Sequence, residues 1–393
     1  TTMETSRRNF LKTMGIATAA AAVFNPANLF ANNPAKRNKR GGSSKLELAW
    51  ENFTGEMKYT FTISGSSRSS TPIVITRLTW DGYTGYGEAA MPPYLGETQA
   101  SVHEFLKKVV PVLEKFDNPF QIEDILIAVD AIATNNTAAK AAVDIALHDL
   151  VGNIIGQPWW KIWGFNPNNT PLTSYTIGYD ASDDVVYEKI EEASWTKVIK
   201  VKLGMSEKED KRMINLIRSK TDTVICIDAN QGWKDKYYAL DMINWLAERN
   251  VNMIEQPMPK YWLDDAAWVT ERSPLPVIAD EACQRLIDVP KLKGAYHGIN
   301  IKLMKCTGMR EAREMVSMAN SLRMKLMIGC MTETSVAISA AAQLSPKMEW
   351  ADLDGNVLIA NDCFDGMKLN EGRITLEDKP GLGLTKKKGI IKL

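Results

Sequence analysis

After Pro171 the sequence repeats one unit, a short run of β-branched and other apolar residues followed by a stretch with helical periodicity. The runs occupy residues 172–178, 198–203, 224–228, 253–255, 277–280, 299–303, 326–329 and 350–354. Strands that alternate with helices build parallel βαβ units, and eight of them are the number that closes a β/α barrel. We therefore expect a TIM-like (β/α)7β barrel over residues 166–365.

Before the repeat, two strand-like segments are followed by segments with helical periodicity, and this order predicts a separate α+β domain over residues 46–165. Residues 58–63 and 73–78 alternate as strands do, and they flank a polar stretch at 64–70 that we expect to form a hairpin tip. Helical periodicity follows at 101–116 and 136–154.

Charged residues end most of the predicted barrel strands. These ends read Lys200-Val-Lys202, Asp228-Ala-Asn230, Glu255-Gln-Pro257, Ala279-Asp-Glu281, Asn300-Ile-Lys302 and Asp352-Leu-Asp354. Barrel enzymes carry their active sites at this face. Charged side chains are seldom buried without a partner, so we expect the strand ends to contact one another.

Three carboxylates predict a metal site. Asp228, Glu255 and Asp280 end consecutive strands, and carboxylates held together raise one another's pKa unless a cation neutralises them. Ligation by oxygen alone suits Mg²⁺. The five cysteines and three histidines lack the spacings of zinc or redox sites, so a metal held by sulfur or imidazole is not expected. The alternative is three unrelated carboxylates paired with lysines.

Two lysines are candidates for acid–base chemistry. Lys202 ends the second predicted strand and Lys302 the sixth, so they should face each other across the barrel mouth. A substrate carbon between them could be reached from both faces. A lysine acts as a base only when its pKa is lowered, which Lys200 and a metal would favour. A salt-bridge role is the alternative for either lysine taken alone.

The N-terminal residues predict a targeting signal. Ser6-Arg7-Arg8-Asn9-Phe10-Leu11-Lys12 precedes an apolar run at 14–24, which resembles a twin-arginine export signal over residues 1–31. This run is too short for a hydrocarbon core of about 30 Å. Residues 32–45 read as a linker. We expect a periplasmic protein, or a cytoplasmic one if the signal is not used; a short amphipathic helix is the alternative.

The charge balance bears on partners. Lys and Arg total 47, as do Asp and Glu, so the chain lacks the basic excess by which nucleic acids or membrane surfaces are held. We expect a small-molecule substrate, no nucleic acid, and no membrane contact in the mature form. The sequence leaves open whether barrels associate into homo-oligomers.

These motifs are together similar to the muconate-lactonizing subgroup of the enolase superfamily, and within it to the dipeptide epimerases. The resemblance covers residues 46–384 and includes the strand ends above. It also includes Ala141-Ala-Val-Asp-Ile-Ala-Leu-His-Asp149, Asp228-Ala-Asn-Gln-Gly-Trp233, Asn300-Ile-Lys-Leu-Met-Lys305 and Lys379-Pro-Gly-Leu-Gly383. It implies that residues 46–165 cap the barrel and that residues 366–393 return to complete the cap.

The resemblance also implies a mechanism. One Mg²⁺ per subunit, held by Asp228, Glu255 and Asp280, would bind the C-terminal carboxylate of a dipeptide. Lys202 and Lys302 would then move the α-proton through an ene-diolate, which inverts the C-terminal residue. The implied substrate contacts are Lys200, Asp352, Asp354, Arg68, Thr176, Cys330, Met331 and Thr332, and the implied supporting residues are Asn230, Glu281 and Lys305.

The narrower assignment depends on two features. Asp352-Leu-Asp354 matches the carboxylate pair that holds the substrate ammonium in dipeptide epimerases, and Arg68 matches the arginine that binds a glutamate side chain. They imply that L-Ala-L-Glu and related Xaa-Glu dipeptides are epimerised. Together with the export signal, this predicts a role in murein peptide metabolism, because cell-wall peptides place D-glutamate next to L-alanine. Cys306-Thr-Gly308 and Gly178 depart from the family pattern and leave the N-terminal residue open. The alternatives are a lyase or cycloisomerase, of the o-succinylbenzoate synthase or muconate cycloisomerase type, and a binding module without turnover.

Overall fold

The computed structural model describes residues 45–63 and 66–393. The predicted export signal and all but the last residue of the predicted linker lie outside the described residues, as do Ser64 and Gly65 of the predicted hairpin tip. Within the described part of the chain, no helix combines the length and the apolar character that a membrane span needs.

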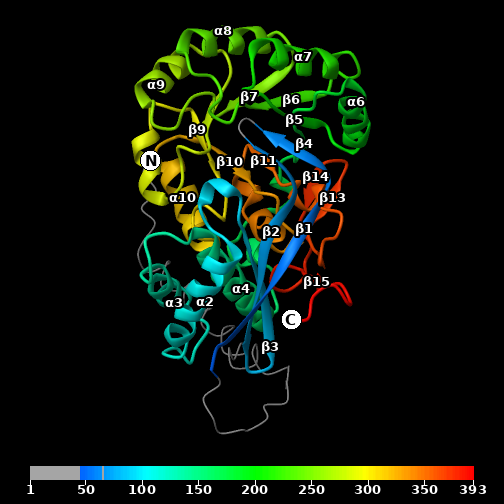
Figure 1. The fold of residues 1–393 in the computed structure, drawn as a ribbon. Helices are drawn as coiled ribbons and strands as arrows, with labels where there is room; N and C mark the ends of the chain where they lie inside the picture. The colour runs from blue at the N-terminus through cyan, green and yellow to red at the C-terminus, as the bar shows by residue number, and fades with distance from the viewer. Residues whose placement is uncertain (1–44, 64–65) are drawn as a thin grey trace, which may run out of the picture. The chain divides into compact units, whose positions relative to one another are not determined.

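Eight strands pair in parallel and in chain order to form the barrel (Figure 1). They are β4 (Tyr175–Ile177), β5 (Val198–Lys202), β6 (Val224–Asp228), β7 (Val251–Glu255), β8 (Val277–Ala279), β9 (Gly298–Ile301), β10 (Lys325–Gly329) and β11 (Trp350–Asp352). Beside β4, the Ser174 amide donates to the carbonyl of Ala351 in β11 at 3.1 Å, which joins the two ends of the sheet. The predicted barrel is confirmed.

Helices connect the strands on the outside of the barrel. They are α6 (Asp183–Glu192), α7 (Glu207–Arg218), α8 (Lys236–Ala247), α9 (Leu263–Arg272), α10 (Met309–Ser321) and α11 (Ser335–Ala342), and the short α12 (Gly355–Leu358) follows the last strand. Between β8 and β9 the chain forms a 3-10 helix, η6 (Leu286–Leu292), instead of an α-helix. Pro290 lies inside it and lacks an amide donor, so the prediction of an α-helix after every strand is wrong at this crossover.

An antiparallel sheet of β1 (Glu47–Ile63), β2 (Ser66–Trp80) and β3 (Tyr83–Ala90) forms the N-terminal domain with α2 (Gln99–Leu113), α3 (Ile122–Asp130) and α4 (Thr137–Ile155). The hairpin strands are longer than predicted. Residues 66–70 continue β2, and Arg68 pairs in register with Phe61. The prediction of a loop there is wrong, because a ladder of backbone hydrogen bonds continues through polar residues that composition assigns to a turn.

Helix α4, predicted from helical periodicity, is buried on nearly all sides. Gly87 of β3 lets the helix approach closely, since a Cβ there would lie 2.0 Å from the carbonyl oxygen of Ala142. Asp144, also on α4, accepts the Met309 amide at the start of α10 at 2.6 Å. The helix therefore packs between the N-terminal sheet and the barrel.

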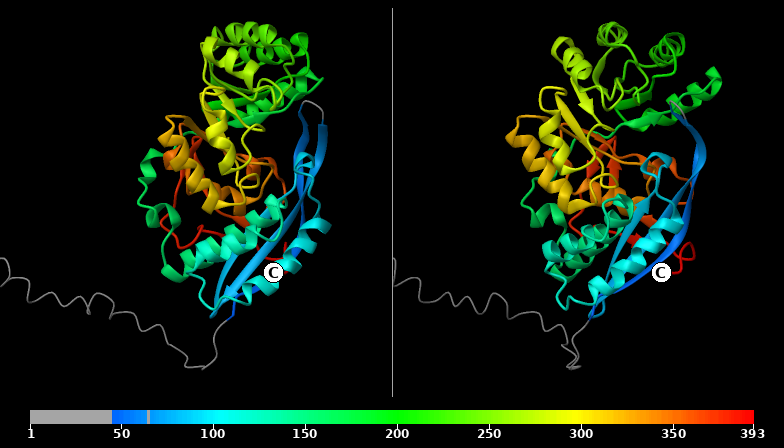
Figure 2. Two further views of the ribbon diagram at one scale, coloured as in Figure 1. Left: turned by 90° about the vertical axis from the view of Figure 1, so that its left-hand side faces the viewer. Right: turned by 60° about the vertical axis from the view of Figure 1, so that its left-hand side comes forward.

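The C-terminal segment, drawn in red in Figures 1 and 2, contacts the N-terminal domain. The Leu382 amide donates to Asp149 of α4 at 2.8 Å, and the Lys392 amide donates to Glu51 of β1 at 2.8 Å. The remaining short elements are η3 (Pro93–Leu95), α5 (Trp159–Ile162), η4 (Pro167–Asn169), η5 (Ala193–Trp195), η7 (Ser345–Lys347), β12 (Phe364–Asp365), β13 (Lys368–Asn370), β14 (Arg373–Thr375) and β15 (Thr385–Lys386).

Candidate active site

Three carboxylates meet at the ends of adjacent barrel strands. Asp228 ends β6, Glu255 ends β7 and Asp280 follows β8, and each is at most 1% exposed. The pairing of β6 with β7 sets Asp228 directly beside Glu255. One oxygen from each of the three carboxylates lies within 4.8 Å of the others, a spacing that would allow one cation to be held.

Lysines neutralise part of this charge. Lys202 donates to Asp228 at 2.6 Å and Lys302 donates to Asp280 at 2.8 Å. Lys200 lies 2.6 Å from Glu255 and Lys305 lies 2.5 Å from Asp280. The strand ends contain these four buried lysines and six buried carboxylates. The carboxylates of Asp228, Glu255, Asp280 and Asp352 form ion pairs with the lysines, and those of Glu281 and Asp354 follow in the chain. The strand ends therefore carry a formal excess of two negative charges, which one divalent cation would balance.

The donor set also fits a hard cation. It offers only oxygen, and burial together with the neighbouring Asp228 raises the pKa of Glu255 to about 7. A carboxylate that resists ionisation in this way is one that a dication would stabilise in its charged form. The three side chains predicted to bind Mg²⁺ thus have the chemistry that this ion prefers.

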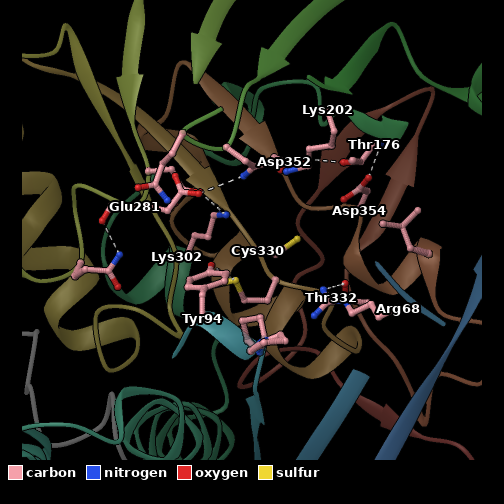
Figure 3. Close-up of a pocket in the computed structure, with 18 of the residues that line it drawn as sticks. Arg68, Tyr94, Thr176, Lys202, Glu281, Lys302, Cys330, Thr332, Asp352 and Asp354 are labelled. Atoms are coloured by element: carbon pink, nitrogen blue, oxygen red, sulfur yellow. Dashed lines mark hydrogen bonds and ion pairs between the residues drawn. The ribbon is translucent and has the colours of Figure 1, made fainter. Parts of the chain in front are cut away.

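Lys202 and Lys302 enter one cavity from different sides (Figure 3). Lys202 ends β5 and Lys302 directly follows β9, four positions further around the barrel. Burial disfavours the charged form of Lys302, but Asp280 outweighs it and raises the lysine pKa well above its usual value. For Lys302, the predicted lowering of the pKa is therefore not met by the protein groups alone.

Lys200 lies beneath the cavity and does not line it. Its ammonium is fully buried and contacts Asp352 at 2.6 Å and Asp228 at 3.3 Å, in addition to Glu255. Along a strand, Lys200 lies roughly 6.6 Å deeper than Lys202. Lys200 therefore bridges the predicted metal-binding carboxylates and Asp352, and its contact with the substrate stays a prediction.

Of the other residues predicted to support the site, two line the cavity and one is buried beside it. Asn230 and Glu281 line the cavity, and the Asn230 side-chain amide donates to Glu281 at 3.3 Å. Lys305 is buried and also donates to the carbonyl oxygens of Asp280 and Asn300. It therefore fixes the loop that follows β9 relative to the carboxylate of Asp280.

Asp352 and Asp354 form a second acidic pair on the far side of Lys200. Asp352 accepts hydrogen bonds from Lys200 at 2.6 Å and from Ser174 at 2.8 Å, and Asp354 accepts the Thr176 amide at 2.6 Å. Asp354 lies beyond the end of β11, yet both carboxyl groups line the cavity. Lys200 neutralises Asp352, whereas burial and the neighbouring Asp352 raise the pKa of Asp354 to about 7.

The cavity has a volume of about 460 Å³ and receives residues from both domains. Its wall includes Thr176, Cys330, Met331 and Thr332, as the sequence predicted. Arg68 reaches it from β2, and its Nη2 donates to the Thr332 hydroxyl at 2.8 Å. Burial raises the pKa of the Cys330 thiol, so this residue is a neutral part of the wall.

Several lining residues were missed from the sequence. They are Pro92, Pro93, Tyr94, Gln231, Lys260, Gln284 and Leu358. The strongest available signal was Pro92-Pro93-Tyr94, because two prolines followed by an aromatic residue and Gly96 predict a rigid turn with a fixed side chain.

Comparisons with known proteins place these features in a family. Residues 52–164 match the mandelate racemase / muconate lactonizing enzyme N-terminal domain, and residues 186–389 match the enolase C-terminal domain-like family. The chain is 55% identical over 384 residues to an L-Ala-D/L-Glu epimerase of Bacteroides thetaiotaomicron, a match that covers 97% of this chain and 99% of the relative.

The comparison with solved structures points to the same family. The dipeptide epimerase of Enterococcus faecalis, complexed with Mg and the dipeptide L-Leu-L-Tyr, has a TM-score of 0.81 at 30% identity, covering 87% of this chain and 99% of that one. The substrate-liganded L-Ala-D/L-Glu epimerase of Bacillus subtilis has a TM-score of 0.81 at 26% identity, with the same coverage. This chain therefore belongs to the dipeptide epimerases of the muconate-lactonizing subgroup in the enolase superfamily.

Proposed function

We propose that this protein is a Mg²⁺-dependent isomerase that inverts the C-terminal residue of dipeptides, with L-Ala-L-Glu and related Xaa-Glu dipeptides as substrates. One observation carries the proposal: Lys202 and Lys302 enter the same cavity from different barrel strands, beside the three carboxylates and the Asp352–Asp354 pair. Inversion at carbon needs a proton acceptor on one face and a proton donor on the other.

The residues divide the work as follows. One lysine takes the α-proton of the C-terminal residue, and the opposite lysine delivers a proton to the other face. Asp280 holds Lys302 at 2.8 Å and Asp228 holds Lys202 at 2.6 Å, so both ammonium groups have fixed positions. The lysines and their carboxylate partners are buried, and a low local dielectric strengthens these electrostatic interactions.

Asp228, Glu255 and Asp280 would hold the Mg²⁺. We propose one ion per subunit because the described residues contain one such cluster of three carboxylates. The bound ion would neutralise the negative charge that develops on the substrate carboxylate when the α-proton leaves, and it would weaken the hold of Asp280 on the Lys302 proton.

The two ends of the cavity favour a dipeptide. Asp352 and Asp354 offer two carboxylates to one cation, which suits the free α-ammonium of the N-terminal residue. Arg68, on the wall beside Thr332, offers a guanidinium to the side-chain carboxylate of a C-terminal glutamate. A role in murein peptide metabolism is part of this proposal, because cell-wall peptides place D-glutamate next to L-alanine and the predicted export signal would bring the enzyme to them.

Substitution Asp354→Asn is expected to lower kcat/KM for L-Ala-L-Glu by about tenfold to one-hundredfold, mainly by raising KM, because an ammonium loses one charged acceptor. Proton NMR of the epimerisation at several substrate concentrations measures the change. Asp365→Asn, on β12, is the matched control and should behave as the parent protein. A lyase or cycloisomerase has no ammonium to bind, so an Asp354→Asn protein with unchanged kinetics would favour that alternative.

A further inference from the structure

Tyr94 is held on a rigid turn at the cavity mouth. The η3 turn starts after Pro92, contains Pro93, and ends at Gly96, whose φ of 70° lies in the left-handed region. The next residue, Glu97, accepts the Ala138 amide at the start of α4 at 2.8 Å. Both sides of the turn are therefore fixed, which holds the backbone of Tyr94 at the cavity mouth.

The hydroxyl of Tyr94 points inward and donates to a weak acceptor. The residue is 50% exposed, because its ring lies at the mouth, whereas its hydroxyl contacts the Met331 sulfur at 2.8 Å. Thioether sulfur accepts hydrogen bonds poorly, and a carboxylate oxygen accepts them about twice as strongly as a neutral oxygen. Burial raises the pKa of Tyr94, so the phenol stays protonated and remains a donor.

A second donor, Arg68 of β2, contacts the residue next to Met331. Thr332 follows Met331 in the chain and holds the Arg68 guanidinium at 2.8 Å, so the contacts of Tyr94 and Arg68 fall on consecutive residues. Consecutive Cα atoms are about 3.8 Å apart. In Figure 3, Tyr94 lies below Lys302 and Arg68 lies beside Thr332 on the same edge of the pocket. Tyr94 and Arg68 thus bring a neutral donor and a cation to adjacent residues of one cavity wall.

We propose that the Tyr94 hydroxyl binds the side-chain carboxylate of the C-terminal glutamate, as a second donor beside Arg68, and so helps to select Glu over uncharged residues at this position. The inference rests on the proposed function. On binding, the phenol exchanges its bond to the Met331 sulfur for one to a carboxylate oxygen, while Arg68 supplies the opposite charge. Uncharged side chains of similar length would leave both donors without this acceptor.

Substitution Tyr94→Phe tests the proposal because it removes the hydroxyl and keeps the ring that packs at the mouth. The substrates are L-Ala-L-Glu and L-Ala-L-Met, whose side chains have similar length and different charge. We expect the preference for Glu, measured as the ratio of the two kcat/KM values, to fall about tenfold to one-hundredfold. The change should come mainly from a higher KM for L-Ala-L-Glu. If turnover of L-Ala-L-Met is below detection, its inhibition constant against L-Ala-L-Glu replaces its kcat/KM. Tyr237→Phe, on the outer face of α8, is the control.

A double-substitution cycle with Arg68→Met completes the test. If both residues hold one carboxylate, the losses are non-additive, and Tyr94→Phe has a smaller effect in the Arg68→Met protein than in the parent. Equal losses for both substrates, or an unchanged preference for Glu, would overturn the proposal. The unsubstituted protein distinguishes failure of the proposed function from failure of the Tyr94 proposal. If it does not epimerise L-Ala-L-Glu, the proposed function is contradicted. If it does, the variants test the role of Tyr94 alone.

Discussion

Replacing Lys302 by methionine is expected to lower epimerisation of L-Ala-L-Glu by at least about 10³-fold while leaving α-proton exchange with solvent for one epimer. General acid–base groups contribute roughly 10²–10⁴-fold, and loss of either lysine removes one face of a two-face reaction. The remaining Lys202 can still remove and return the proton that faces it. Lys202→Met should show the complementary pattern, with exchange of the opposite epimer.

The structure indicates that these variants keep their fold. Without Lys302, Asp280 is still neutralised by Lys305 at 2.5 Å, and without Lys202, Asp228 keeps Lys200 at 3.3 Å. Deuterium exchange followed by proton NMR, with each epimer as the starting material, measures both outcomes. Lys291→Met, on η6, is the control because its side chain is exposed. If both single variants exchanged the same epimer, the assignment of the lysines to opposite faces would be wrong.

Removal of the metal is expected to have a comparable effect. The parent protein treated with EDTA should lose activity by about 10³-fold or more and recover it with Mg²⁺, since a cation at a developing negative charge contributes several kcal/mol. Glu255→Gln should not recover, because a neutral amide replaces the carboxylate between Asp228 and Asp280. Glu271→Gln, exposed on α9, is the matched control.

A second measurement keeps this prediction independent of turnover. A ligand that binds only the folded state stabilises it, so Mg²⁺ should raise the Tm of the EDTA-treated parent and of Glu271→Gln. The Tm of Glu255→Gln should respond much less at the same concentration. Full activity of a demonstrably metal-free parent would contradict the proposed role of the three carboxylates.

The barrel and its strand-end chemistry could be predicted because both follow from local spacing. Intervals of 26, 27, 25 and 22 residues separate Lys202, Asp228, Glu255, Asp280 and Lys302. Each interval is the length of one repeat, which consists of a strand, a crossover segment and its connecting loops. Parallel strands place these ends on one face of the barrel, so their proximity can be predicted without information about the rest of the fold.

Depth and long-range contacts could not be predicted in the same way. Alternation correctly places Lys200 and Lys202 on one face of β5, but it does not show that Lys200 lies a layer deeper and is covered. Tyr94 approaches Met331 across 237 residues, and Arg68 approaches Thr332 across 264. Such contacts depend on how the N-terminal domain packs against the barrel, which no local pattern encodes.

The central claim is that two lysines invert the C-terminal residue of a dipeptide. Its most direct test is proton NMR of L-Ala-L-Glu with the protein and Mg²⁺ in D₂O, with EDTA as the control. We expect the glutamate α-proton signal to disappear while the signals of L-Ala-D-Glu grow, and we expect EDTA to stop both changes. Unchanged spectra across a panel of Xaa-Glu and hydrophobic dipeptides would contradict the claim and favour a lyase or cycloisomerase.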